Sequence, residues 1–401
     1  MTADERREHL YTQRVYPTVN NEDLLEFRIP PNTKGQLDLS NVLLHFIVTI
    51  PKPTDKSNTS HPQNYLGPKQ FSSLEVRVNG EAVTRRSCAN EYSLGSYFQQ
   101  NINYSLDYQA SAGKPIGIYD SAALTTTQVA GYNAALKAEL VDSRTNLMAN
   151  SQEFEILMPI DPTIFYSNNL LPSNTAIDLS FERLSAKFST ILFKDTAIVD
   201  LVMELKDTYL ILPFKKDQRL FEMERNAIAR PIKIHYDDYV IKRFNVPKGT
   251  ASVMMANLLT GILPTKMFWA VQTMDAYGGS FKESSTRFSR NGIKKANLLL
   301  DGNEVNDYPV TASAAHVSLP FVKFLDNTNQ QLNGLQSRTL TPREFEANHF
   351  ILSTTFDQDE SGSLSFQFDF DDVNDNDLVL IVCSLYDRTM KIDQNRNFQI
   401  I

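Results

Sequence analysis

Apolar and polar side chains alternate in several short stretches of the sequence. In segment 364–370 a leucine and three phenylalanines occupy every second position, with serine, glutamine and aspartate between them. Segments 74–78 and 177–181 alternate in the same way. Because successive side chains of a strand point to opposite faces, each segment predicts a strand with one buried face.

Two other stretches are apolar without interruption. Segment 42–50 reads VLLHFIVTI and segment 378–383 reads LVLIVC. Both are short enough to be strands that are covered on both faces. Asn79-Gly80 and Asp301-Gly302 follow apolar strand segments, and these dipeptides favour the positive φ angles of tight hairpins. Strands and hairpins therefore dominate the predicted structure.

Signals for helices are few. Thr341-Pro342-Arg343-Glu344 forms a capping box with proline at the first helical position, and it predicts a helix that ends near Asn348. Segments 131–140 and 217–229 are two further candidates for short helices. No alternation of strands and helices occurs, which argues against a parallel doubly wound sheet and favours an all-β sandwich or barrel.

The chain resembles two copies of one plan. Phe27-Arg28-Ile29-Pro30 precedes Lys34-Gly35, and Phe244-Asn245-Val246-Pro247 precedes Lys248-Gly249. The hairpins at Gly80 and Gly302 make a second pair of landmarks. The two glycine offsets, 249 − 35 = 214 and 302 − 80 = 222, differ by only eight residues. We therefore predict two similar sandwiches in tandem.

These landmarks divide the chain into five parts. We predict an N-terminal arm over 1–23, a first sandwich over 24–212, a polar linker over 213–229, a second sandwich over 230–389 and a C-terminal arm over 390–401. The first sandwich contains a long excursion over 87–150. Long loops on a rigid scaffold are where contacts with other molecules are usually located.

Composition limits the function. Of the 401 residues 42% are hydrophobic, so a large core can form, and the net charge of −8 argues against a protein that neutralises nucleic-acid phosphates. The N-terminal residues contain no apolar stretch, so we expect no secretion signal and a soluble protein of a reducing compartment.

No motif of catalytic chemistry is present in the sequence. Phosphate-binding glycine loops, GxSxG, HExxH and the H-x-H pair of cupin metal sites are all missing. We therefore predict no catalytic residue, cofactor or metal site, and no enzyme. His45 lies in an apolar segment and is expected to be a hydrogen-bonded core or interface histidine, while Cys88 and Cys383 are expected to be small buried side chains.

Segment 369–377 is rich in aspartate and asparagine, and we call it the acidic turn. Its oxygen ligands could hold calcium. An EF-hand loop that begins at Asp372 would need glycine at 377 and glutamate at 383, where Asp377 and Cys383 stand. A turn whose carboxylates accept hydrogen bonds from backbone amides is the favoured interpretation, with calcium as the alternative.

Four stretches resemble a known family. They are FRIPPNTKGQLDLSNVLLHFIVTI at 27–50, SSLEVRVNGEAVTRRSCANEYSLGSYF at 72–98, PIKIHYDDYVIKRFNVPKG at 231–249 and KKANLLLDGNEVNDYPV at 294–310. They resemble the major capsid protein of Polinton/Maverick elements and the related adintoviruses, and the resemblance extends to about residue 390.

The resemblance implies an all-β double jelly-roll, that is, two tandem eight-stranded antiparallel jelly rolls with a few short helices. It further implies a homotrimer that forms a pseudo-hexagonal capsomer. Such capsomers tile an icosahedral shell around double-stranded DNA, together with penton and minor capsid proteins. The protein would then reside in the virion after synthesis in a host cell, without direct sequence-specific nucleic-acid binding.

Two functions are therefore compared. The first is the major capsid protein, a structural building block. The alternative is a carbohydrate-binding or adhesive β-sandwich protein, which needs an exposed aromatic platform. The sole tryptophan, Trp269, lies in the apolar run 267–271 and is expected to be buried. The apolar C-terminal residues Phe398 and Ile400 lead us to expect that an arm docks on a neighbouring subunit or on the inner side of the shell.

Overall fold

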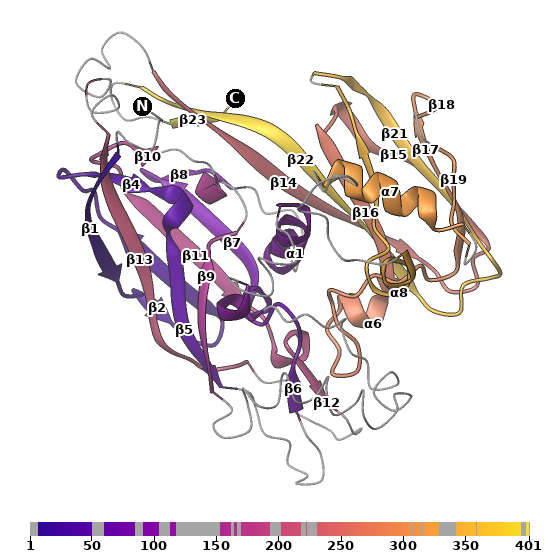
Figure 1. Cartoon of the computed structure of the whole chain (residues 1–401), viewed down its shortest axis with the longest axis horizontal. Helices are drawn as coiled ribbons and strands as arrows, with labels where there is room; N and C mark the ends of the chain where they lie inside the picture. The colour runs from indigo at the N-terminus through magenta and orange to yellow at the C-terminus, as the bar shows by residue number, and fades with distance from the viewer. Residues whose placement is uncertain are drawn as a thin grey trace.

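The computed structural model contains two β-sandwiches side by side, one from each half of the chain (Figure 1). It describes residues 7–49, 60–84, 91–103, 113–117, 153–161, 164–166, 170–192, 202–217, 222, 231–305, 308–313, 316–328, 342–357, 359–393 and 398–400. The buried apolar residues form one cluster that includes members of both halves.

The first half folds into two facing antiparallel sheets. One sheet contains β1 (Arg7–Val15), β13 (Leu205–Asp217), β5 (Leu43–Thr49) and β9 (Glu153–Pro159), with the short strands β4 (Gln36–Asp38) and β10 (Leu170–Leu171). The other contains β2 (Val19–Asn20), β3 (Leu24–Ile29), β11 (Ile177–Arg183), β7 (Phe71–Val78) and β8 (Glu81–Ala82). A separate two-stranded sheet joins β6 (Ser60–Pro62) to β12 (Thr190–Leu192).

The second half repeats this design. Its first sheet contains β14 (Ile232–Val246), β22 (Leu378–Ile392), β16 (Lys266–Thr273) and β20 (Leu352–Thr355), and β23 (Phe398–Ile400) pairs with the end of β22. Its second sheet contains β15 (Ser252–Ile262), β21 (Ser361–Phe370), β17 (Ile293–Leu300), β18 (Asn303–Glu304) and β19 (Val310–Thr311).

The order of neighbouring strands is the same in both halves. If eight strands of each half are counted along the chain, the order across one sheet is first, eighth, third and sixth, which gives β1-β13-β5-β9 and β14-β22-β16-β20. Across the other sheet the order is second, seventh, fourth and fifth, which gives β3-β11-β7-β8 and β15-β21-β17-β18. This is the jelly-roll connectivity, and the predicted tandem fold is confirmed.

The strands correct three predicted boundaries. β1 pairs with β13, so the first jelly roll includes residues that we assigned to an arm over 1–23. β13 continues to Asp217, inside the predicted linker 213–229. β22 extends to Ile392, past the predicted end at 389, and β23 folds back on it, so that Ile400 packs against the core of its own chain. This segment of the C-terminal arm therefore docks within the chain, where we had expected contact with a neighbouring subunit or the shell.

One of the two landmark pairs is also corrected. Phe27 lies in β3, the second strand of its jelly roll, whereas Phe244 lies in β14, the first strand of the other. These similar stretches therefore occupy different positions in the repeat. The hairpins are equivalent, because Asn79-Gly80 joins β7 to β8 and Asp301-Gly302 joins β17 to β18, with positive φ at all four residues.

The alternating segments bury their apolar faces as predicted. In β21 the four apolar side chains of segment 364–370 are at most 6% exposed, and the alternating residues of β7 and β11 are also buried. All residues of segment 378–383 are buried, as expected for a strand covered on both faces. Trp269 from the opposite sheet packs edge-on against Phe366 at 5.2 Å between ring centroids.

Few helices occur in the described residues. α8 (Pro342–Asn348) confirms the helix predicted from the capping box. The sequence did not predict α1 (Glu91–Asn103), α6 (Met274–Tyr277) or α7 (Ser318–Asn327). Short 3-10 turns are η2 (Leu39–Asn41), η3 (Pro68–Gln70), η4 (Lys114–Ile116), η5 (Ile164–Tyr166) and η6 (Ala186–Phe188). The predicted helix at 131–140, and that at 217–229 apart from residues 217 and 222, lie outside the described residues.

Candidate functional site

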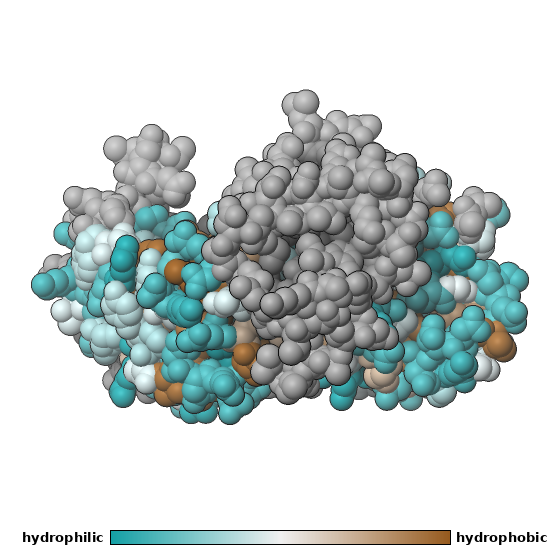
Figure 2. All heavy atoms as spheres, turned by 90° about the horizontal axis from the view of Figure 1, so that it is seen from below, coloured by the Kyte–Doolittle hydropathy of each residue, from teal (hydrophilic) through white to brown (hydrophobic). Residues whose placement is uncertain are grey.

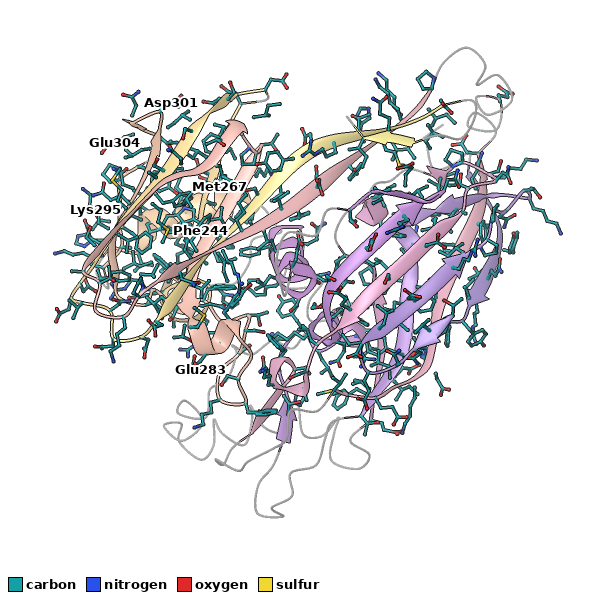
Figure 3. All side chains as sticks on the ribbon, turned by 180° about the vertical axis from the view of Figure 1, so that it is seen from behind. Phe244, Met267, Glu283, Lys295, Asp301 and Glu304 are labelled. Carbon is teal, nitrogen blue, oxygen red and sulfur yellow. The ribbon has the colours of Figure 1, made fainter. Side chains whose placement is uncertain are left out.

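A buried lysine lies where the two jelly rolls meet. The Lys69 side chain is completely buried, and its ammonium group donates to Gln63 Oε1 at 2.8 Å and to Ser284 Oγ at 3.0 Å. Gln63 Nε2 donates in turn to the carbonyl oxygens of Ser280 and Glu283. Figure 3 shows Glu283 at the edge of the second half, beside the β6–β12 pair of the first. This polar cluster fixes the loop 280–286 against the first jelly roll.

Aromatic side chains form the other part of the junction. α1 lies between the two halves (Figure 1), and its Tyr97 and Phe98 rings pack 5.2 and 5.8 Å from the Phe288 ring of the second half. The Tyr97 hydroxyl is 2.8 Å from His349 Nδ1. Because aromatic pairs bury large areas, these contacts hold α1, which lies within the excursion 87–150 of the first half, against the second half.

Gly279 lies at a close approach between the halves. Its φ is +84°, and a Cβ atom built on it would lie 2.7 Å from Lys187 Cγ and 2.8 Å from the Phe188 ring in η6. Gly302 has the same φ of +84° in the β17–β18 hairpin, but nothing lies within 4 Å of its Cβ position. The two glycines therefore have the same φ, but only at Gly279 would an added side chain clash with its neighbours.

We expect Gly279→Ala to destabilise the protein more than Gly302→Ala. In both variants a non-glycine residue at positive φ lowers the free energy of unfolding by about 1 kcal/mol. In Gly279→Ala the steric clash with η6 lowers it by a further amount of about 1–3 kcal/mol. Calorimetric unfolding of both variants measures the difference. Equal losses of stability would contradict the close approach of η6 to Gly279.

A row of stacked side chains crosses the outer face of the sheet that contains β5. The His45 ring stacks on the Tyr209 ring with centroids 4.3 Å apart. The Arg14 guanidinium lies over the same Tyr209 ring, 4.7 Å from its centroid. His45 Nδ1 lies 2.9 Å from the Asp207 carbonyl oxygen and Nε2 lies 2.9 Å from Glu155 Oε1. His45 is 6% exposed, so the expectation of a hydrogen-bonded core or interface histidine is confirmed.

β14 and β22 form a long ribbon that extends from the second half across to the first (Figure 1). Its register places Asp237 opposite Asp387 and Lys233 opposite Lys391. Crowding by surrounding protein atoms, and then the facing Asp387 carboxylate, raise the pKa of Asp237. Like charges that face each other across a strand pair are unfavourable, so neither pair stabilises this ribbon.

The side chains of the acidic turn bind backbone groups of the turn itself and of the adjacent loop 247–250. Asn374, which is 6% exposed, donates to two carbonyl oxygens at 2.9 Å, and Asp377 Oδ1 accepts from the Lys248 amide at 2.9 Å. Asp371 Oδ2 pairs with the Arg290 guanidinium at 2.5 Å. Among the described residues, no three His, Cys, Asp or Glu side chains are arranged to hold a metal ion. The contacts are those of the predicted turn.

The remaining candidates are structural. Cys383 is a fully buried side chain as expected, while Cys88 lies outside the described residues. Trp269 is 1% exposed and donates from Nε1 to the Tyr308 hydroxyl at 3.2 Å, so it provides no platform for a sugar ring. Hydrophilic residues dominate the described part of the face in Figure 2.

An open cleft of about 670 Å³ separates the β17–β18 hairpin from α7 and β20. Asp301 and Glu304, which Figure 3 places together at the rim of the second half, line it with Lys323 and Asp326. None of its described lining residues is a histidine or a cysteine. The described part of the chain also contains no helix of the length and apolarity needed to cross a membrane.

Solved structures match nearly the whole chain. The cryo-EM structure of the Sputnik virophage has a TM-score of 0.64 at 12% identity and covers 98% of this chain and 89% of that one. The mavirus major capsid protein has a TM-score of 0.58 at 11% identity, covering 97% of this chain and 90% of that one. The PBCV-1 capsid has a TM-score of 0.58 at 9% identity, covering 98% and 96%.

The chain has the double jelly-roll fold of viral capsid proteins. No family model matches the sequence, and no curated protein matches it either. At 9–12% identity the similarity rests on strand order and not on individual residues. The repeated eight-strand order agrees with the fold of the matched structures.

Proposed function

We propose that this chain is a major capsid protein of the Polinton/Maverick and adintovirus type. The observation that carries the proposal is the eight-strand order repeated in both halves, together with solved capsid structures that match nearly the full chain. A shell protein needs a large core, rigid sandwiches and contact surfaces. The chain supplies a core that includes both halves and a junction that fixes one jelly roll on the other.

The proposed assembly is a homotrimer. Two similar jelly rolls per chain give six similar blocks in three chains, which is the shape of a pseudo-hexagonal capsomer. Contact in such a ring joins different patches of neighbouring copies, and rotation by a third of a turn closes it. Obligate interfaces of this kind usually bury more than about 2,000 Å².

The proposed role is structural and has no catalytic step. Capsomers would tile an icosahedral shell around double-stranded DNA in the virion, with penton and minor capsid proteins as further partners. The net charge of −8 argues against a main role in neutralising DNA phosphates, and we propose no sequence-specific binding of DNA. The protein would be made in the host cell.

Size-exclusion chromatography with light scattering tests this proposal on the purified full chain. We expect a trimer, about three times the chain mass of 45.5 kDa, and hexagonal particles with a central three-fold axis in negative-stain images. A monomer at every concentration tested would contradict the proposed function. Binding to glycans by such a monomer would favour the adhesive alternative.

A further inference from the structure

The open cleft between the β17–β18 hairpin, α7 and β20 is strongly acidic. Its described lining contains five carboxylates and one ammonium group, which give it a net charge of −4 at neutral pH. The carboxylates are those of Asp301, Glu304, Asp326, Asp357 and Glu360, and the ammonium group is that of Lys323. They come from three separate segments, namely the hairpin, α7 and the residues after β20. Because the carboxylates repel one another, a bound cation is favoured there.

The fold does not need all of this charge, as the first half shows. Asn79 begins the β7–β8 turn, its amide donates to the Ala176 carbonyl oxygen at 2.9 Å, and its Oδ1 accepts from the Ala176 amide at 2.8 Å. Asp301 begins the β17–β18 turn and makes the same two contacts with Ser363, at 3.0 and 2.9 Å. A neutral amide therefore suffices for the turn, and the negative charge of Asp301 is additional to it.

Thr354 adds a buried polar group to the same cleft. It lines the cleft and is 7% exposed, and its hydroxyl makes no hydrogen bond with any described residue. Thr354 lies opposite Met267, two residues before Trp269 in β16, so its side chain points between the two sheets, as the indole does. A buried hydroxyl without a partner is unfavourable, and a donor group on a bound ligand would satisfy it.

The inner side of the cleft is apolar. Leu300, Val305 and Phe356 line it, and all three are partly buried and pack against the core. Figure 3 shows Asp301 and Glu304 close together at the rim of the second half. The cleft thus presents carboxylates on its rim and hydrocarbon surface beneath them.

We propose that this cleft binds a linear aliphatic polyamine, that is, ammonium groups joined by short methylene segments. The ammonium groups donate charge-assisted hydrogen bonds to the rim carboxylates, and the methylene segments cover the apolar inner side. A volume of about 670 Å³ is that of a small-molecule site. The described carboxylates are spread around the cleft, and no three of them are arranged to hold a metal ion. The inference does not depend on the proposed function.

Titration calorimetry of the full chain with spermine, a tetra-amine, tests the proposal. We expect one spermine per chain. The affinity should fall from spermine to the triamine spermidine and again to the diamine putrescine, because each step removes one ammonium group. It should also fall as the salt concentration rises, since the rim carboxylates are exposed to solvent.

The double variant Asp301→Asn/Glu304→Gln removes two rim charges. Asparagine keeps the acceptor for the Ser363 amide, as Asn79 does in the first half, so the turn should be retained. We expect spermine to bind about tenfold more weakly, because two pairs of ammonium and carboxylate groups are lost.

The double variant Asp207→Asn/Glu81→Gln is the matched control. It changes the net charge by the same amount, and both residues are exposed and lie outside the cleft. Asp207 has a φ of +47°, close to the +51° of Asp301, so asparagine enters the same backbone conformation in both variants. Spermine should bind this control as it binds the wild-type chain.

Thr354→Val tests the buried hydroxyl. Valine has nearly the same shape, so we expect the fold to be retained and spermine to bind about threefold more weakly, because one hydrogen bond to an ammonium group is lost. Unchanged affinity would show that the ligand does not reach Thr354, and it would overturn the proposed binding mode.

Three results overturn the proposal itself. They are the absence of spermine binding to the wild-type chain, equal weakening in the cleft variant and its control, and displacement of spermine by an equal concentration of Ca²⁺. Tighter binding of N-acetylated tetralysine, which also carries four ammonium groups, would assign the cleft to a basic protein segment and overturn it as well.

Hydrogen exchange of the wild-type chain, with and without spermine, decides the case if the cleft variant does not fold. We expect slower exchange of the backbone amides in segments 300–305 and 354–357, which line the cleft on two sides. Slowing that is confined to other segments would overturn the proposal. Chromatography of the same samples reports the oligomeric state separately, so the failure of this inference and that of the proposed function are distinguishable.

Discussion

Replacement of Lys69 by alanine is expected to lower the free energy of unfolding by about 3 kcal/mol, because buried acceptors lose a charged donor and a cavity remains. The ammonium group is fully buried and bonds to both halves, through Gln63 Oε1 in the first and Ser284 Oγ in the second. Loss of this link weakens the junction more than either core. We therefore expect calorimetry to resolve two partly separated transitions in the variant.

Two further variants identify the cause. Lys69→Met keeps most of the side-chain volume but removes the donor. The stability that Lys69→Met loses is therefore due to the polar contacts, and the additional loss in Lys69→Ala is due to the cavity. Lys233→Ala removes an exposed lysine from β14 and should change stability by less than about 0.5 kcal/mol. If Lys69→Ala unfolds in one transition at the wild-type temperature, the polar cluster does not hold the jelly rolls together.

Local patterns predicted the strands whose one face is buried. Segment 364–370 repeats with the period of a strand, and β21 buries all its phenylalanines. The hairpins at Gly80 and Gly302 were also predictable, because only a few dipeptides tolerate positive φ at two successive positions. In both cases the structure is determined by interactions among residues that are close together in the sequence.

β1 was not predictable in this way. Its sequence, REHLYTQRV, is mostly polar, and it lies at the edge of its sheet with β13 as its one partner among the described strands. An edge strand buries little, so its pattern is close to that of a solvated arm. The identity of β1 follows from its equivalence to β14, which becomes visible only when the strand order of both halves is known.

Two features were misjudged because the deciding information is not local. Phe27-Arg28-Ile29-Pro30 and Phe244-Asn245-Val246-Pro247 both end a strand before a turn, and this local likeness says nothing of which strand it is. α1 was missed because tyrosine, asparagine and glycine are weak helix formers. Packing of Tyr92, Tyr97 and Phe98 into the core stabilises the helix instead.

No pattern in the sequence predicted the contacts that join the two jelly rolls. Lys69 stands between proline and glutamine, where a lysine is expected to be solvated, and its partner Ser284 lies 215 residues away. Gly279 resembles an ordinary turn residue until η6 is seen beside it. Contacts between distant segments depend on the relative placement of the jelly rolls, and that placement is a property of the assembled fold.

Replacement of Trp269 by alanine is expected to have the largest effect on stability, a loss of about 4 kcal/mol, as is usual for removal of a buried aromatic side chain. The indole is 1% exposed, packs edge-on against Phe366 and donates to the Tyr308 hydroxyl. Its removal opens a cavity between the two sheets of the second jelly roll. Because Trp269 is the sole tryptophan, unfolding by urea must be followed by circular dichroism and not by tryptophan fluorescence.

The variant Trp269→Phe separates packing from hydrogen bonding. It keeps an aromatic ring against Phe366 but leaves the Tyr308 hydroxyl without the indole donor, so we expect a loss of about 1–2 kcal/mol. The second jelly roll should account for the loss, since the indole contacts no described aromatic residue of the first half. Equal losses for alanine and phenylalanine would show that the hydrogen bond, and not the filled space between the sheets, dominates at this position.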